Sequence, residues 1–211
     1  MKRRMFVMSS LAPIALAACG GGDDDVAQPD PSTTGTRGAA LDALKRAAEH
    51  MDQNVSYRGG YVWQYLPDLS VSWGEMEAKR SMCWIQPPGT PTAGHAFLDA
   101  YHATGNELFY NAAVRTAQAL VSAQHPAGGW NYIHDFAGED SLKHWYDTVG
   151  KNGWRLEEFQ HYYGNATFDD AGTAVSSQFM LRMYLEKKDP QFKASIALST
   201  AGLNWASFFS R

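Results

Sequence analysis

The strongest constraint on the fold is an internal repeat, in which apolar residues recur twice at helical spacing. Between 93 and 101 they occupy positions i, i+3, i+4, i+7 and i+8, and Gly105 then ends the expected helix. Residues 97–101 align with 180–184 at an offset of 83, and the alignment continues through a second apolar stripe. Each unit is therefore a pair of helices followed by a loop. The pattern predicts an all-α fold of repeated helical hairpins that forms a solenoid or part of an (α/α) toroid.

The loops after the helices also contain a repeated motif. Gly59-Gly60-Tyr61 and Gly128-Gly129-Trp130 each follow an expected helix. The last unit reaches Arg211, where another Gly-Gly-aromatic loop would be expected. We therefore interpret the chain as an incomplete copy of a longer fold.

The first residues predict export. Residues 1–4 are positively charged, and residues 5–18 are apolar and too few to span a bilayer. The run Leu-Ala-Ala before Cys19 matches a bacterial lipobox, which predicts a cleaved signal over 1–18 and a lipid on Cys19. Residues 19–38 are rich in Gly, Asp, Pro, Ser and Thr and predict a flexible tether. The folded domain is expected over 39–211.

The expected lipid anchor indicates the location of the protein. Acyl chains on Cys19 would anchor it stably to the cell envelope. Gly20, rather than Asp, follows the cysteine and favours the outer membrane. The Arg3-Arg4 pair fits a twin-arginine signal as well as the general secretory route, so both remain open. We expect a monomer.

The amino-acid composition excludes some classes of function. The net charge is −4 and no basic run follows Arg4, which argues against a nucleic-acid partner. Seven Trp, ten Tyr and ten Phe either fill the core or offer flat faces on which sugar rings stack. The histidines show no metal-binding spacing, and no nucleophile or nucleotide motif occurs. With Cys19 acylated, Cys83 is expected to be a small buried hydrophobe.

Ordered motifs resemble the pectic acid lyases, the family 10 polysaccharide lyases. They include a Gly-Gly-aromatic loop, a Gln-x-Pro-x-Gly-Gly-Trp loop and a Thr-x-Asp-Asp segment that leads into a Phe-x-x-Arg-x-Tyr helix. A further stretch is similar to a related subgroup of pectate lyases. The residues are 59–63, 124–130, 167–173 with 179–184, and 84–91.

The resemblance implies an incomplete toroid that acts on galacturonate polymers with calcium. Such a lyase removes the C5 proton of a uronate and expels the oxygen at C4, and a hard cation stabilises the charge that builds on the carboxylate. The family's arginine base and second calcium ligand would lie beyond Arg211, so the catalytic residue is unknown. Asp170 departs from the family, which has Asn at this position.

The best metal candidates are Asp169 and Asp170, with Asp169 at the family's ligand position. Both precede an expected helix, so they are equally interpreted as capping residues. Trp130 is either a sugar-stacking platform or a packing anchor. Asn165 is a candidate donor to a sugar hydroxyl.

A long loop over 131–166 adds candidates that bind uronate carboxylates. Lys143 and Arg155 carry the required charge, and the planar guanidinium of Arg155 matches a carboxylate best. The alternative for each is a solvated surface charge.

Three functions stay open. The first is calcium-assisted β-elimination of pectate. The second is a surface-anchored carbohydrate-binding protein without activity. The third is a glycoside hydrolase on a helical toroid, with Asp169 and either Glu157 or Glu158 as acid and base.

Overall fold

The computed structural model describes residues 31–153 and 164–202. The chain divides into two compact units, Met1–Gly38 and Ala39–Arg211. Cys19 lies outside the described residues. The first helix, α1 (Pro31–His50), begins ahead of Ala39, so residues 31–38 of the expected tether are helical. Proline fits the first position of a helix, where its missing N–H costs no hydrogen bond.

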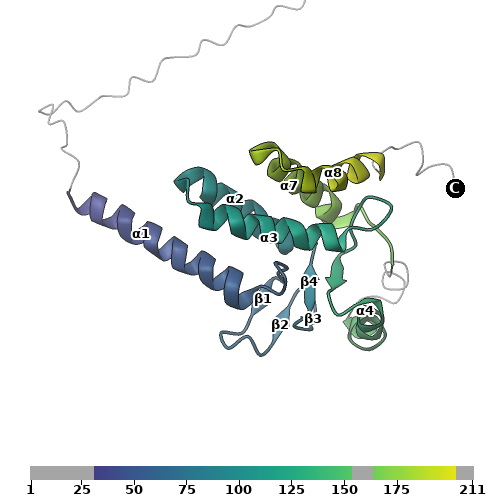
Figure 1. The fold of residues 1–211 in the computed structure, drawn as a ribbon. Helices are drawn as coiled ribbons and strands as arrows, with labels where there is room; N and C mark the ends of the chain where they lie inside the picture. The colour runs from purple at the N-terminus through teal and green to yellow at the C-terminus, as the bar shows by residue number, and fades with distance from the viewer. Residues whose placement is uncertain (1–30, 154–163, 203–211) are drawn as a thin grey trace, which may run out of the picture. The chain divides into compact units, whose positions relative to one another are not determined.

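Two helical hairpins form the body of the second unit. The first joins α2 (Thr90–Thr104) to α3 (Glu107–Ala123), and the second joins α7 (Gly172–Lys187) to α8 (Pro190–Gly202). The helices of each pair lie side by side, and α7 packs on α2 and α3 (Figure 1). The all-α class and the helical hairpins predicted from the sequence are confirmed. In the described residues, no helix is both long and apolar enough to cross a membrane.

The repeat extends to the turns between the helices. Gly105 and Lys188, 83 residues apart, both take the left-handed conformation that ends α2 and α7. The next residues, Asn106 and Asp189, each accept the backbone N–H two residues further on, at 3.0 Å. These side chains satisfy donors at the start of α3 and α8 that have no partner within the helix. The two hairpins are thus built by the same local rules.

Short strands lie in the segment before the first hairpin and in the segment between the two hairpins. β1 (Gln64–Tyr65), β2 (Ser72–Trp73) and β3 (Glu77–Ala78) form an antiparallel sheet, and β4 (Met82–Trp84) pairs with β5 (Ile133–Asp135). Strands of two or three residues are too short to leave an alternating pattern, so the sequence did not predict them. The remaining elements are η1 (Met51–Val55), α4 (Glu139–Trp145), η2 (Tyr146–Gly150), α5 (Lys151–Gly153) and η3 (Asp169–Ala171).

Gly94 allows the two hairpins to approach each other. A Cβ at this position of α2 would lie 2.4 Å from the ring of Phe179 on α7, which is fully buried. Cys83 is also buried, and burial raises the pKa of its thiol to about 12. The core around this contact joins both hairpins to the loop aromatics; its fully buried members include Leu98, Phe109, Leu120, Trp130, Phe179, Met180, Met183 and Phe192.

We expect Gly94→Ala to destabilise the protein by about 1–3 kcal/mol, the usual cost of overpacking. The loss exceeds the helix-propensity gain of about 1 kcal/mol that alanine brings in an open position. Gly38→Ala is the matched control, because Gly38 is also helical and a Cβ there meets nothing within 4 Å. Urea unfolding measures the free energy of unfolding of both variants. A Gly94 variant as stable as the control would contradict the close packing of α2 on α7.

Candidate functional site

Two motif loops that are distant in the sequence meet in one hydrogen-bonded unit. Trp130 donates its backbone N–H to Thr173 Oγ1 at 2.9 Å, and Thr167 donates its backbone N–H to the Trp130 carbonyl at 2.9 Å. Thr173 Oγ1 in turn donates to the Thr167 carbonyl at 2.6 Å. We call these three residues the junction. The junction joins the Gly-Gly-Trp loop to the segment that carries Asp169 and Asp170.

The first repeat holds its loop aromatic in the same way. Tyr61 donates its backbone N–H to Thr90 Oγ1 at 3.0 Å, and Trp84 donates its backbone N–H to the Tyr61 carbonyl at 2.8 Å. Trp84 and Thr90 precede their junction counterparts Thr167 and Thr173 by 83 residues. At the same offset, Gln86 occupies the position that Asp169 has in the second repeat.

Trp130 packs in the core beneath the junction. Its side chain has no solvent exposure, and its indole N–H donates to the Leu120 carbonyl at 2.8 Å. A buried indole that satisfies its donor is a packing residue. The packing interpretation therefore describes Trp130 here, because a fully covered ring offers no face to a sugar.

The two aspartates lie at the start of α7, in a strained turn. Asp170 has φ 48° and Ala171 has φ 60°, a conformation that non-glycine residues adopt only at an energetic cost. Ala171 is the N-cap residue of α7 and provides no side-chain bond. Asp170 is exposed, and its Oδ2 accepts from Gln86 Nε2 at 2.8 Å. The side chain of Asp169 lies outside the described part.

Gln86 brings a second carboxylate close to Asp170. Its Nε2 also donates to Glu75 Oε1 at 3.2 Å, and its Oε1 accepts from the indole of Trp84 at 3.2 Å. Reasoning from the sequence missed Glu75 and Gln86 as site residues. The sequence carried two signals, the resemblance of 84–91 to a lyase subgroup and the equivalence of Gln86 with Asp169 in the repeat, and neither gives Gln86 a role of its own.

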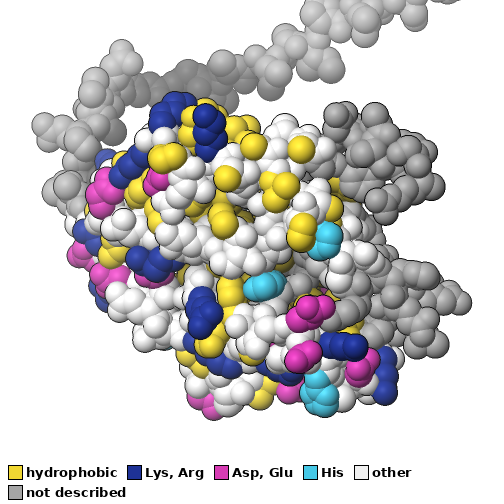
Figure 2. Space-filling model, turned by 45° about the vertical axis from the view of Figure 1, so that its right-hand side comes forward, with side chains coloured by type: hydrophobic (Ala, Val, Ile, Leu, Met, Phe, Trp, Pro, Cys, Tyr) yellow, Lys and Arg dark blue, Asp and Glu magenta, His cyan; other side chains and the backbone are white. Residues whose placement is uncertain are grey.

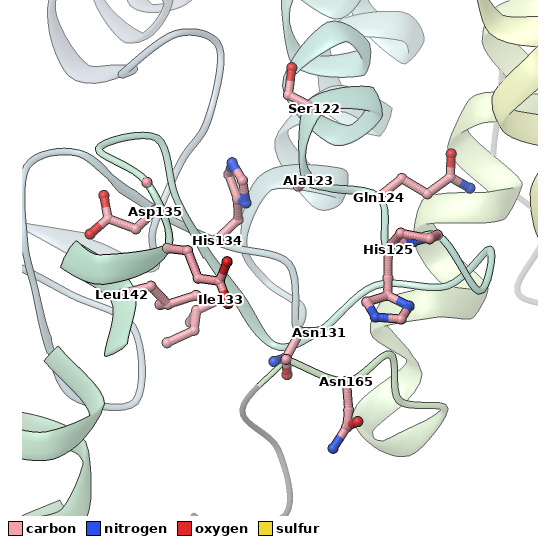
Figure 3. Close-up of a pocket in the computed structure, with 14 residues that line it drawn as sticks. Ser122, Ala123, Gln124, His125, Asn131, Ile133, His134, Asp135, Leu142 and Asn165 are labelled. Atoms are coloured by element: carbon pink, nitrogen blue, oxygen red, sulfur yellow. The ribbon is translucent and has the colours of Figure 1, made fainter. Parts of the chain in front are cut away.

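A pocket of about 380 Å³ opens between the end of α3, strand β5 and the start of α4 (Figure 3). This volume is within the range of small-ligand sites. Asn165 lines the pocket as a potential hydrogen-bonding group, and in Figure 3 it lies at the same end as Asn131. The other lining residues are Ser122, Ala123, Gln124, His125, Pro126, Ile133, His134, Asp135, Gly138, Glu139, Leu142 and Gly164.

The pocket is lined by imidazole, amide and hydroxyl groups and by the acidic residues Asp135 and Glu139. Burial lowers the pKa of His134, with Asp135 opposing the shift, which favours the neutral imidazole. His125 accepts the backbone N–H of Ala127 on Nδ1 at 3.0 Å. The carboxylate of Asp135 points away from the other labelled side chains and accepts from Ser81 Oγ at 2.7 Å. Imidazole and amide groups both donate and accept, as sugar hydroxyls require.

The described structure does not bring Lys143, a predicted cationic residue, to the pocket. Lys143 is exposed on α4 and is absent from the pocket lining, and Arg155 lies outside the described residues. Figure 2 shows acidic and basic side chains interspersed on one face of the molecule, with histidines among them.

Among the described residues, no group of three or more His, Cys, Asp or Glu side chains could hold a metal ion. Glu75 and Asp170 share one amide donor, but two carboxylates are fewer than the six to eight oxygens that calcium takes.

Comparison with known proteins gives a distant structural likeness. No family model matches the sequence, and no curated protein matches it. Two solved structures align with a TM-score of 0.47 and 18% identity over 81% of this chain. One is a family 10 polysaccharide lyase from Cellvibrio cellulosa, and the other is an aspartate-to-alanine mutant of that lyase in complex with trigalaturonic acid. The chain spans about half, 49%, of each.

Proposed function

We propose that this chain is a polysaccharide lyase that acts on an acidic polysaccharide, polygalacturonate, by β-elimination. The observation that carries the proposal is the junction. It unites the two loops that resemble lyase motifs and sets Asp169 and Asp170 at the strained start of α7. Backbone strain is retained where the surrounding structure holds it, and it often marks a functional site.

The reaction needs groups that bind the uronate and stabilise charge at its carboxylate. In this proposal the uronate binds beside Asp170, which is exposed at the start of α7. The amide and imidazole groups of the pocket, Asn131 and Asn165 among them, suit the hydroxyls of a neighbouring sugar. Because Trp130 is buried below, its contribution is to hold the loop in place.

Calcium is the proposed cofactor. It would neutralise the substrate carboxylate, with Asp169 and Asp170 as its protein ligands. Support comes from the resemblance and from the chemistry, since a carboxylate oxygen is the ligand that a hard cation prefers.

A glycoside hydrolase is the second candidate, and one observation favours it. Glu75 Oε1 and Asp170 Oδ2 both accept from Gln86 Nε2. The distance between the two oxygens therefore cannot exceed the sum of the two donor–acceptor distances. Hydrolysis of a glycosidic bond uses two carboxyl groups at short separation. Glu157 and Glu158, the partners suggested by the sequence, lie outside the described residues.

The purified protein, given polygalacturonate and calcium, is expected to produce a C4–C5 double bond that absorbs in the ultraviolet. A chelator should stop the increase, and added calcium should restore it. Reducing ends without absorbance would contradict elimination and support the hydrolase. Binding without any product would support a carbohydrate-binding protein.

A further inference from the structure

Two hydrogen bonds fix the backbone of Gln86. Its N–H donates to the Tyr132 carbonyl at 3.3 Å, and its carbonyl accepts the indole N–H of Trp63 at 3.0 Å. The residue is 6% exposed, and a Cβ on Gly172 would meet its backbone at 3.7 Å. The segment that begins α7 therefore packs against a fixed point.

The side chain of Gln86 has one favourable orientation. Trp84 donates its indole N–H to Oε1, and this places the amide nitrogen toward Glu75 and Asp170. Reversal would set an NH₂ group against an indole N–H and an oxygen against two carboxylates. Both contacts would be repulsive, because an indole only donates and an ionised carboxylate only accepts.

We propose that Gln86 is a positioning residue, which holds Glu75 and Asp170 together as a pair of carboxylates at the start of α7. This proposal depends on the proposed function only in assuming that Asp170 takes part in the reaction. Two ionised carboxylates at this separation repel each other, and a donor that bonds both offsets the repulsion. The amide provides one N–H to each, and each bond to an ionised acceptor is stronger than a neutral one.

The internal repeat independently supports the position of Gln86 beside Asp170. Gln86 and Asp169 are equivalent residues of successive repeats, each two positions after the residue that bonds the loop aromatic. The first repeat thus presents an amide where the second presents a carboxylate. The amide reaches across to the next residue of the neighbouring repeat, Asp170, so the two repeats make one polar cluster.

The test compares Gln86→Met and Gln86→Glu with Gln118→Met. Methionine keeps the length of the side chain and removes both donors, and glutamate keeps the shape but donates only when protonated. Gln118 is the matched control, because its exposed amide makes one bond, to Gln191 Oε1 at 3.0 Å. Elimination or hydrolysis of polygalacturonate is measured from pH 4 to pH 9, together with thermal unfolding.

We expect Gln86→Met to lower kcat by about tenfold or more, as misplacement of a site group does. The loss should be similar at every pH. Gln86→Glu should match it at neutral pH and recover in part at acid pH, whereas the control should behave like the parent. A Gln86→Glu profile parallel to that of Gln86→Met, or full activity in both, would overturn the proposal.

A readout without substrate separates this proposal from the proposed function. In nitrogen–proton NMR spectra, the side-chain NH₂ signals of Gln86 should shift in Asp170→Asn and in Glu75→Gln, each variant mainly affecting one proton. Signals that respond to neither variant would overturn the positioning role. If the parent protein neither binds nor degrades polygalacturonate, the proposed function fails, and shifted NH₂ signals still support the positioning role.

Discussion

Asp169→Ala is expected to abolish calcium-dependent binding and cleavage of polyuronate. Asp169 is the residue that the resemblance places at a calcium ligand, and its backbone is fixed between Thr167 of the junction and the strained Asp170. Loss of a group that stabilises developing charge costs about 10²–10³ in rate. A ligand that also binds the ground state should reduce affinity as well.

The measurement pairs the rate of ultraviolet absorbance increase with calorimetric binding of oligogalacturonate, with and without calcium. Asp42→Ala provides the control, since Asp42 is an exposed aspartate on α1. Thermal unfolding of both variants confirms that the fold is kept. A variant that binds and cleaves like the parent would show that the site is assigned to the wrong carboxylate.

Trp130→Ala should cost about 3–5 kcal/mol of folding free energy, the range for removal of a large buried aromatic. The ring is fully buried, and its removal also leaves the Leu120 carbonyl without its indole donor. Small domains are stable by only about 5–15 kcal/mol, so a large share of the total is lost.

Urea unfolding of Trp130→Ala, beside Trp73→Ala on β2, checks this expectation. Trp73 is partly exposed, so the cost of its removal should be much smaller. A sugar-stacking role at Trp130 predicts the opposite result, with affinity for oligosaccharide lost and stability unchanged. That outcome would contradict the packing role.

The hairpins were predictable from the sequence because helical spacing is local. Apolar positions in 93–101 and their repeat in 180–184 specify one buried face for each helix, and Gly105 marks the end of α2 where the structure has it. Lys188 ends α7 in the same left-handed conformation without being a glycine, so composition alone did not reveal that turn.

The polar cluster was not predictable, because its members share no local pattern. Glu75 follows a short strand, Gln86 follows β4, and Asp170 lies 84 residues further on. In the described structure, the start of α7 lies against the Gln86 backbone, and the Gln86 amide bonds both carboxylates. Likewise, the Gly-Gly-Trp motif indicated an important aromatic, but its burial depends on packing under α7, which no loop sequence encodes by itself.

The junction also constrains the order in which parts of the chain fold. A loop of more than thirty residues separates Trp130 from Thr167, and the bond of the Trp130 amide depends on the Thr173 hydroxyl in the first turn of α7. A ribosome-bound chain that ends before Thr173 has completed α2 and α3 but has no acceptor for the Trp130 amide. Closing so long a loop is paid for in chain entropy before any contact rewards it. We therefore expect the aspartate turn to form late in folding, after α2 and α3 have paired and Thr173 can bond Trp130.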